Sequence, residues 1–285
     1  MWAVSCKQPT FYTIRIIVIV PTWRVYMEFV VSAHTDIGIK KKTNQDSVLL
    51  QVARTDVGNV AFGVVCDGMG GLAKGELASS TLIKEFATWF QTGLRDMLEE
   101  GSMSEQRLYE EWRNIIISIN QKITNYGNDN RINLGTTTVG VLIYNGHYYA
   151  FNVGDSRLYR INNKLTQVTK DQSYIQREMD AGRMTPEQAK TDPQRNVLLQ
   201  CVGASAIVEP DFFSGDANVN DVFMLCSDGF RHVITPDEIF QYLNPLALVS
   251  EDNMKVNAKY LTDLDKYRME NDNISVALIK VVQEV

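Results

Sequence analysis

The stretch VVCDGMGGLAKGE, Val64 to Glu76, places one carboxylate, Asp67, at the end of an apolar run and follows it with four glycines. The run VAFGVVC, which ends just before Asp67, predicts a strand. The residues after it carry apolar side chains at i, i+3, i+4 and i+7 from Ile83, which predicts a helix with one buried face. An acid followed by glycine at a strand end is usually a turn. A functional role for Asp67 becomes plausible only if other acids occur in the same sequence context, beside an apolar strand.

Four more aspartates lie beside apolar, strand-like runs: Asp46 in NQDS, Asp155 in VGDSR, Asp228 in CSDGF and Asp272 in NDNIS. Each alone is best interpreted as a turn residue, but five in one context predict a shared site at a sheet edge. Carboxylates that converge repel one another unless cations neutralise them, and oxygen-only ligands favour the hard cations Mg²⁺ and Mn²⁺. The glycines would let the backbone pass close to such an ion, with the Gly68 carbonyl as a ligand.

The rest of the chain alternates strand and helix patterns without a repeat or a linker. Asn145-Gly146 between two alternating runs is a strong hairpin signal, and Asn162-Asn163 indicates another hairpin. Thr185-Pro186 and Thr235-Pro236, each followed by Gln or Glu at the third helical position, predict helix starts. A polar segment, residues 171–200, interrupts the strands. This order predicts an α+β fold with antiparallel sheets and segregated helices.

Composition excludes several other classes. The net charge of −6 argues against nucleic-acid binding. The four cysteines form no CxxC pair, Cys66 and Cys226 sit in apolar runs, and three scattered histidines are too few for a histidine metal site. We expect a cytoplasmic protein without membrane association.

The N-terminal residues decide where the domain begins. The run FYTIRIIVIVP, residues 11–21, is too short to span a bilayer and carries Arg15. A secretory signal stays open, although no small-residue cleavage site follows. We favour residues 1–26 as an extension created by a mis-assigned start, with Met27 the true start and one domain over residues 27–285.

Seven segments, in order, carry a resemblance to a known family: TDIGIKKKTNQDS, VVCDGMGGLAKGELAS, LGTTTVGV, NVGDSRLYRI, DPQRNVLLQCVGA, LCSDGF and NDNISVALI. Together they resemble the bacterial branch of the metal-dependent protein phosphatases (PPM, type 2C). The resemblance covers about Met27 to Val285. It implies a four-layer α-β-β-α sandwich of two antiparallel sheets flanked by helices. It also implies hydrolysis of phosphoserine and phosphothreonine by a metal-activated water at a binuclear Mn²⁺ or Mg²⁺ centre.

The resemblance also implies residue roles. Asp67 would bridge both ions with help from the Gly68 carbonyl, Asp228 and Asp272 would hold one ion, and Asp46 would act partly through water. Asp155, with Asp228, resembles the ligands of a third, weaker ion, whereas Arg157 is expected to be structural. Implied partners are Ser/Thr-phosphorylated proteins, including a eukaryotic-like Ser/Thr kinase, and the implied state is a monomer.

Three positions depart from the family pattern. Lys41 stands where an arginine usually grips the substrate phosphate, and lysine lacks the planar bidentate fork. Met69 replaces a histidine proposed as general acid in animal members, although bacterial relatives share the methionine. Gln172 replaces the histidine of a DHS motif beside a mobile flap.

Two other functions compete with a metal-dependent phosphatase. A pseudophosphatase that binds phosphoproteins without turnover is the main alternative, supported by Lys41 and opposed by the complete set of acids. A nucleotide-binding loop is disfavoured, because DGMGGLAKGE lacks the GxxxxGK[ST] spacing. A cysteine phosphatase is excluded, since neither Cys66 nor Cys226 opens a phosphate-binding loop.

Overall fold

The computed structural model describes residues 11–16, 27–69 and 74–283, and the side chains of all these except residues 11–16. Gly70 and Gly71 of the opening stretch, and most of residues 1–26, therefore lie outside the described residues. Whether translation begins at Met27 stays a prediction.

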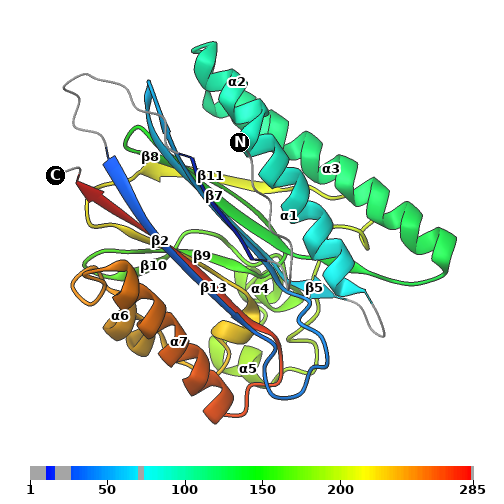
Figure 1. Cartoon of the computed structure of the whole chain (residues 1–285). Helices are drawn as coiled ribbons and strands as arrows, with labels where there is room; N and C mark the ends of the chain where they lie inside the picture. Colours follow the sequence, from blue (N-terminus) through cyan, green and yellow to red (C-terminus); the bar gives the residue numbers. More distant parts are fainter. Residues whose placement is uncertain (1–10, 17–26, 70–73, 284–285) are drawn as a thin grey trace.

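Two β-sheets pack face to face (Figure 1). The first has the strand order β1-β3-β4-β7-β8-β11 and the second the order β10-β9-β12-β13-β2; a short pair, β5-β6, stands apart. The strands of the first sheet are β1 Phe11–Ile16, β3 Ser47–Thr55, β4 Gly58–Cys66, β7 Thr138–Tyr144, β8 His147–Val153 and β11 Asp211–Asp216. Those of the second are β2 Met27–Asp36, β9 Arg157–Ile161, β10 Leu165–Gln167, β12 Val222–Cys226 and β13 Ile274–Gln283, and the short pair is β5 Gly68–Met69 with β6 Gly135–Thr136.

Helices cover the outer face of each sheet (Figure 1). The first sheet carries α1 Gly75–Gln91, α2 Gly93–Glu99 and α3 Glu105–Asn130, and the second carries α6 Pro236–Leu243 and α7 Glu251–Tyr267. Two short helices, α4 Tyr174–Asp180 and α5 Pro186–Thr191, lie in the polar segment between β10 and β11, and a 3-10 turn, η1 Asp228–Phe230, follows β12. No helix of the described residues is long and apolar enough to span a membrane.

Three hydrophobic cores separate the four layers. The core between the two sheets is aliphatic, with Val141 and Ile279 among its members. The core under α1–α3 is aromatic: the Phe62 ring stacks against Trp112 with centroids 6.1 Å apart and meets Trp89 edge-on at 5.4 Å. The third core lies under α6 and α7. The predicted four-layer sandwich is confirmed.

Local sequence signals account for most element boundaries. Asn145 and Gly146 both have positive φ, 49° and 80°, as the predicted two-residue hairpin turn requires. Thr185 and Thr235 form capping boxes at the starts of α5 and α6, each with proline in the first turn. The predicted strand and helix starts at these positions are confirmed.

Strands β1 and β11 and helix α2 are among the elements that were not predicted. Strand β1 adds an edge to the first sheet in parallel with β3, so that sheet has one parallel pair. Helix α2 has no side-chain cap and is held by the buried Leu94, Met97 and Leu98. Strand β11, DFFSGD, pairs with β8 although it is a mostly exposed edge with no clear alternation.

The aromatic core gives a stability test. Replacing the fully buried Phe62 by alanine leaves a cavity among Phe86, Trp89 and Trp112, and we expect the free energy of unfolding to fall by about 3–5 kcal/mol. Ile117→Ala, on the exposed face of α3, is the matched control and should change stability by less than about 0.5 kcal/mol in urea denaturation. An equal loss of stability in both variants would contradict the buried position of Phe62 in this core.

Candidate active site

The predicted acids meet at one end of the sandwich because of how the strands pair. Ser47 is opposite Cys66 in the first sheet, so Asp46 and Asp67 lie on adjacent chain segments just beyond that pair. In the second sheet Cys226 is opposite both Val276 and Arg157. The segments with Asp228, Asp272 and Asp155 therefore leave their strands at the same end.

Asp46 is the most buried of the five acids, with 1% of its surface exposed. Neither carboxylate oxygen has a hydrogen-bond partner of normal geometry, although the Ser227 and Ser275 hydroxyls lie nearby. Burial, together with the charges of Asp228 and Asp272, raises the pKa of Asp46 to about 7. An ionised Asp46 is therefore costly unless a cation accompanies it.

Asp67 experiences the same repulsion. Burial first, and then the negative charges of the other four acids, raise its pKa well above the ordinary range. Its backbone is fixed by two threonines: the Asp67 N–H donates to Thr137 Oγ1 at 3.1 Å, and Thr136 Oγ1 donates to the Asp67 carbonyl at 2.9 Å. The backbone of Asp67 is therefore held at the rim by Thr136 of β6 and by Thr137, which lies between β6 and β7.

Glycines let the acid-bearing loops approach one another. A Cβ at Gly68 would clash with the carbonyl oxygens of Gly75 and Gln45, and one at Gly229 would clash with the Asn273 carbonyl. At Gly38, whose φ is +75°, it would clash with the Asp272 carbonyl. The glycine after Asp67 thus serves close packing of backbone against backbone; a role for its carbonyl as a ligand stays a prediction.

Asn273 joins the loop before β3 to the start of β13. This buried side chain accepts from the Gln45 N–H at 2.9 Å and donates to the carbonyls of Ile37 at 2.9 Å and Thr43 at 3.2 Å. The loop that carries Lys41 is therefore tied directly to the residue after Asp272. Sequence reasoning quoted this asparagine within NDNIS but gave it no role.

Asp155 is held by Arg231, a residue that sequence reasoning missed. Arg231 Nη2 donates to the Asp155 carbonyl at 2.8 Å and lies 3.4 Å from its Oδ2. Burial and the negative charge of Asp228 raise the pKa of Asp155 to about 6. Arg157, predicted to be structural, forms a bidentate pair with Asp171, with both N···O distances 2.7 Å.

Asp228 and the segment 270–272 are joined by His232. Its Nε2 is 3.4 Å from Asp228 Oδ2, and its Nδ1 is 3.4 Å from Glu270 Oε2. Glu270 in turn accepts from the N–H groups of Asn271 and Asp272, at 2.7 and 2.9 Å. His232 and Glu270 were also missed; their only sequence signal was a position beside SDGF and NDNIS.

Lys41 lies at this rim, while its role in binding the substrate phosphate stays a prediction. Its Nζ lies 2.6 Å from Asp272 Oδ1, and Asp67 and Asp228 are close enough to act on its charge. Lys41, Asp155, Asp228 and Asp272 all line one cleft with a volume of about 840 Å³. The wall facing these acids comes from the flap, the segment 171–200 with α4 and α5.

The flap is fixed at its base by Gln172. The Gln172 side chain accepts from the Gly154 N–H at 2.9 Å and donates to Asp211 Oδ2 at 2.8 Å, while its own N–H donates to the Gly154 carbonyl at 2.8 Å. Residues 173 and 198 close the flap through an antiparallel bridge. The glutamine that departs from the family motif therefore anchors the flap next to Asp155.

The site fits hard divalent cations by its donor chemistry. Its donors are carboxylate oxygens, and the buried Asp46 Oδ1 and Oδ2 and Asp228 Oδ1 have no hydrogen-bond partner. In the part of the chain that the structure describes, no three His, Cys, Asp or Glu side chains meet closely enough to share one ion. One of the expected ligands, Asp272, is paired with Lys41.

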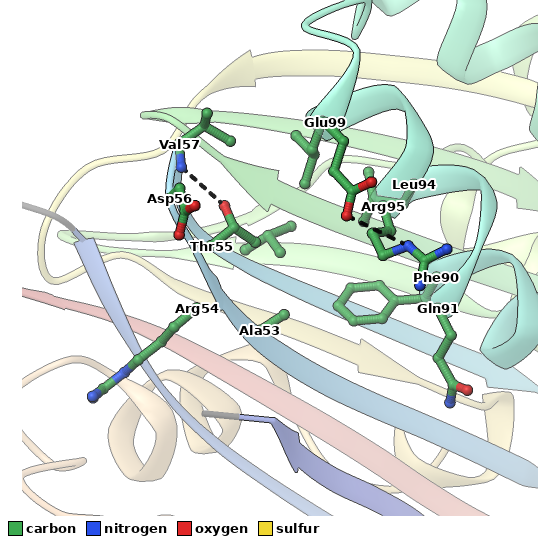
Figure 2. Close-up of a pocket in the computed structure, with 12 residues that line it drawn as sticks. Ala53, Arg54, Thr55, Asp56, Val57, Phe90, Gln91, Leu94, Arg95 and Glu99 are labelled. Atoms are coloured by element: carbon green, nitrogen blue, oxygen red, sulfur yellow. Dashed lines mark hydrogen bonds and ion pairs between the residues drawn. The ribbon is translucent and has the colours of Figure 1, made fainter. Parts of the chain in front are cut away.

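A second cavity, of about 470 Å³, lies between the β3–β4 hairpin and helices α1 and α2 (Figure 2). Its walls include the apolar Val57, Val60, Phe90, Leu94 and Leu98. Arg95 and Glu99 form a 3.7 Å ion pair at its edge. It contains none of the five acids, so it is not the candidate active site.

Comparison with known proteins identifies the family. The Protein phosphatase 2C family profile matches residues 38–264. The chain belongs to this family. It is 30% identical over 261 residues to protein phosphatase PhpP of Streptococcus pneumoniae, covering 89% of this chain and 98% of that protein.

Solved structures agree with this assignment. Serine/threonine phosphatase Stp1 from Staphylococcus aureus superposes with a TM-score of 0.75 and 29% identity, covering 94% of this chain and 100% of that one. The catalytic domain of the phosphatase PstP, in complex with two manganese ions, gives a TM-score of 0.72 and 25% identity over 90% of this chain and 99% of that one. The predicted family resemblance and enzyme class, a protein phosphatase of the 2C type, are confirmed.

The raised carboxyl pKa values give a pH prediction for the metal-free phosphatase. Asp46 holds its proton more tightly in the folded protein than in the unfolded chain, so this stabilisation is present at low pH and is lost as the pH rises through about 7. In EDTA we expect the melting temperature to fall between about pH 5 and about pH 8, and Asp46→Asn to reduce that fall.

The control for this prediction is Asp129→Asn, an exposed carboxylate at the end of α3, which should keep the wild-type pH profile. Adding Mn²⁺ at about pH 8 should raise the melting temperature of the wild type more than that of Asp46→Asn. A wild-type profile in Asp46→Asn would contradict the raised pKa.

Proposed function

We propose that this chain is an active metal-dependent phosphatase that hydrolyses phosphoserine and phosphothreonine in proteins at the rim formed by Asp46, Asp67, Asp228 and Asp272. The observation that supports this most strongly is the convergence of buried carboxylates with unpartnered oxygens. Ionised carboxylates held this close together repel one another, and bound divalent cations would neutralise that repulsion.

Each residue of the rim has a proposed role. Asp67, with the Gly68 carbonyl, Asp228 and Asp272 would hold two Mn²⁺ or Mg²⁺ ions, with Asp46 as a further acid. Asp155 would contribute to a third ion. When bound, these ions supply Lewis-acid activation of a water and neutralise charge on the phosphoryl group. Coordination by Asp272 would release Lys41 from its present ion pair.

Lys41 then binds the substrate phosphate. Its side chain is half-exposed and opens into the cleft, so a phosphate can replace Asp272 as its partner. A lysine ammonium binds a phosphate oxygen as a point charge rather than through two parallel hydrogen bonds. Met69 cannot donate a proton, so water would protonate the leaving group.

A pseudophosphatase is the alternative, and the intact set of acids argues against it. A chain that only bound phosphoproteins would not need five converging carboxylates. We further propose that the protein acts as a cytoplasmic monomer, with the domain from Met27 to Val285, on phosphoproteins that include a Ser/Thr kinase.

The acids give the direct test. Asp67→Asn and Asp228→Asn should each lower Mn²⁺-dependent hydrolysis of p-nitrophenyl phosphate by roughly 100-fold or more while the protein stays folded by circular dichroism. Asp129→Asn, which changes the same group far from the cleft, should keep the wild-type rate. Near wild-type turnover in either site variant, or no turnover in the wild type with Mn²⁺ or Mg²⁺, would refute the proposal.

The role of Lys41 has its own test. Lys41→Ala should raise KM for a phosphopeptide by about ten-fold, since one charge-assisted hydrogen bond contributes about 1.5–3 kcal/mol, with a smaller effect on kcat. Lys41→Arg should lower KM below the wild-type value. Lys40→Ala is the control, since its exposed side chain does not line the cleft. An unchanged KM in Lys41→Ala would remove Lys41 from the site.

A further inference from the structure

The flap carries two basic side chains, Lys190 and Arg195, that line the same cleft as Asp155, Asp228 and Asp272. Helix α5 presents Pro186, Ala189 and Lys190 to the cleft, which is the i, i+3, i+4 spacing of a single helix face. Both charged side chains are exposed. The flap therefore turns a defined, positively charged face toward the space where substrate would lie.

These two cations differ from the other basic residues of the cleft. Lys41 is paired with Asp272, Arg157 with Asp171, Arg231 with Asp155, and His232 lies between Asp228 and Glu270. In contrast, no ion pair in the described part of the chain involves Lys190 or Arg195. Their charge is available to a ligand.

The acidic residues nearest to them in sequence do not line the cleft. Glu187 and Asp192 are absent from its walls, and the Asp192 carboxylate accepts from the Gln194 N–H at 2.7 Å. Arg195 follows in the same turn, with its N–H donating to the Asp192 carbonyl at 3.1 Å. The flap's local hydrogen bonds thus occupy this acid and leave the basic side chain facing the cleft.

The flap geometry is also constrained enough to give selectivity. The capping box at Thr185 and the proline at the first helical position define the start of α5. The bridge between Ser173 and Leu198 and the Gln172 anchor fix the two ends of the segment. Because the flap is held at its base, the two cations have a limited range of positions over the cleft.

We propose that Lys190 and Arg195 select phosphoprotein segments that carry acidic residues beside the phosphorylated serine or threonine. This rests on the proposed function: the phosphoryl group occupies the acidic rim with its cations, and the flanking carboxylates lie against the flap. The ligand is an acidic phosphopeptide segment. Its recognition is electrostatic, so it depends on ionic strength.

The test compares kcat/KM for two phosphothreonine peptides that differ only in flanking residues, glutamate or alanine, in the presence of Mn²⁺. The wild type should prefer the glutamate peptide by roughly two- to ten-fold, the range expected for two exposed ion pairs. Lys190→Ala/Arg195→Ala should bring the ratio to about one, and Lys190→Glu/Arg195→Glu should reverse it. The two kcat/KM values of each ratio are measured on the same variant, so a lower fraction of active protein in that variant does not change the ratio.

The matched control is Lys84→Ala/Lys122→Ala. It removes two exposed lysines of α1 and α3 that do not line the cleft, and it should keep the wild-type ratio. High salt should reduce that ratio toward one. A wild-type ratio of one or less, or an unchanged ratio in Lys190→Ala/Arg195→Ala, would overturn the inference.

A different outcome would separate this inference from the proposed function. If neither peptide is hydrolysed, the proposed catalytic activity fails. The selectivity is then decided by calorimetric binding of the same two peptides made with a non-hydrolysable phosphonate. Tighter binding of the acidic peptide that is lost in Lys190→Ala/Arg195→Ala supports the role of the flap, and equal binding contradicts it.

Discussion

Repulsion among carboxylates held at one end of the sandwich is the constraint on which the rest of this structure depends. Asp46 and Asp67 lie on adjoining segments, and Asp155, Asp228 and Asp272 approach from the second sheet. Burial and like charge together raise the pKa values of Asp46, Asp67 and Asp155. A fold that pays this energetic cost needs a compensating charge. We propose that divalent cations provide it, and that the same cations would activate a water for phosphate-ester hydrolysis.

The scaffold around the acids resists that repulsion with neutral hydrogen bonds and a few ion pairs. Asn273 ties the loop before β3 to β13, Arg231 holds Asp155, and His232 with Glu270 joins Asp228 to the segment before β13. Glycines at Gly38, Gly68 and Gly229 allow the backbones to come within reach of one another. The chain itself thus holds the acid-bearing segments in place at the rim.

Most of the fold was predictable because its signals are local. The Asn145-Gly146 turn, the capping boxes at Thr185 and Thr235, and the helical stripes all act within a few residues. Strand β11 and helix α2 were missed because tertiary contacts hold them: β11 is an exposed edge, and α2 depends on its buried leucines. The difference between local signals and tertiary contacts also applies to the site. The acids at strand ends were predicted because each lies in a short sequence motif. Arg231, His232 and Asn273 were missed because they act through contacts distant in sequence or carry no motif.

The central claim is that these acids jointly hold a pair of hard cations. Crystals grown at neutral pH with Mn²⁺ and measured at the manganese absorption edge test it most directly. The account predicts two strong anomalous peaks at the rim, both in contact with the Asp67 carboxylate, with Asp228 and Asp272 beside one of them and Lys41 displaced from Asp272. Anomalous density that is absent from this rim, or found only elsewhere on the molecule, would contradict it.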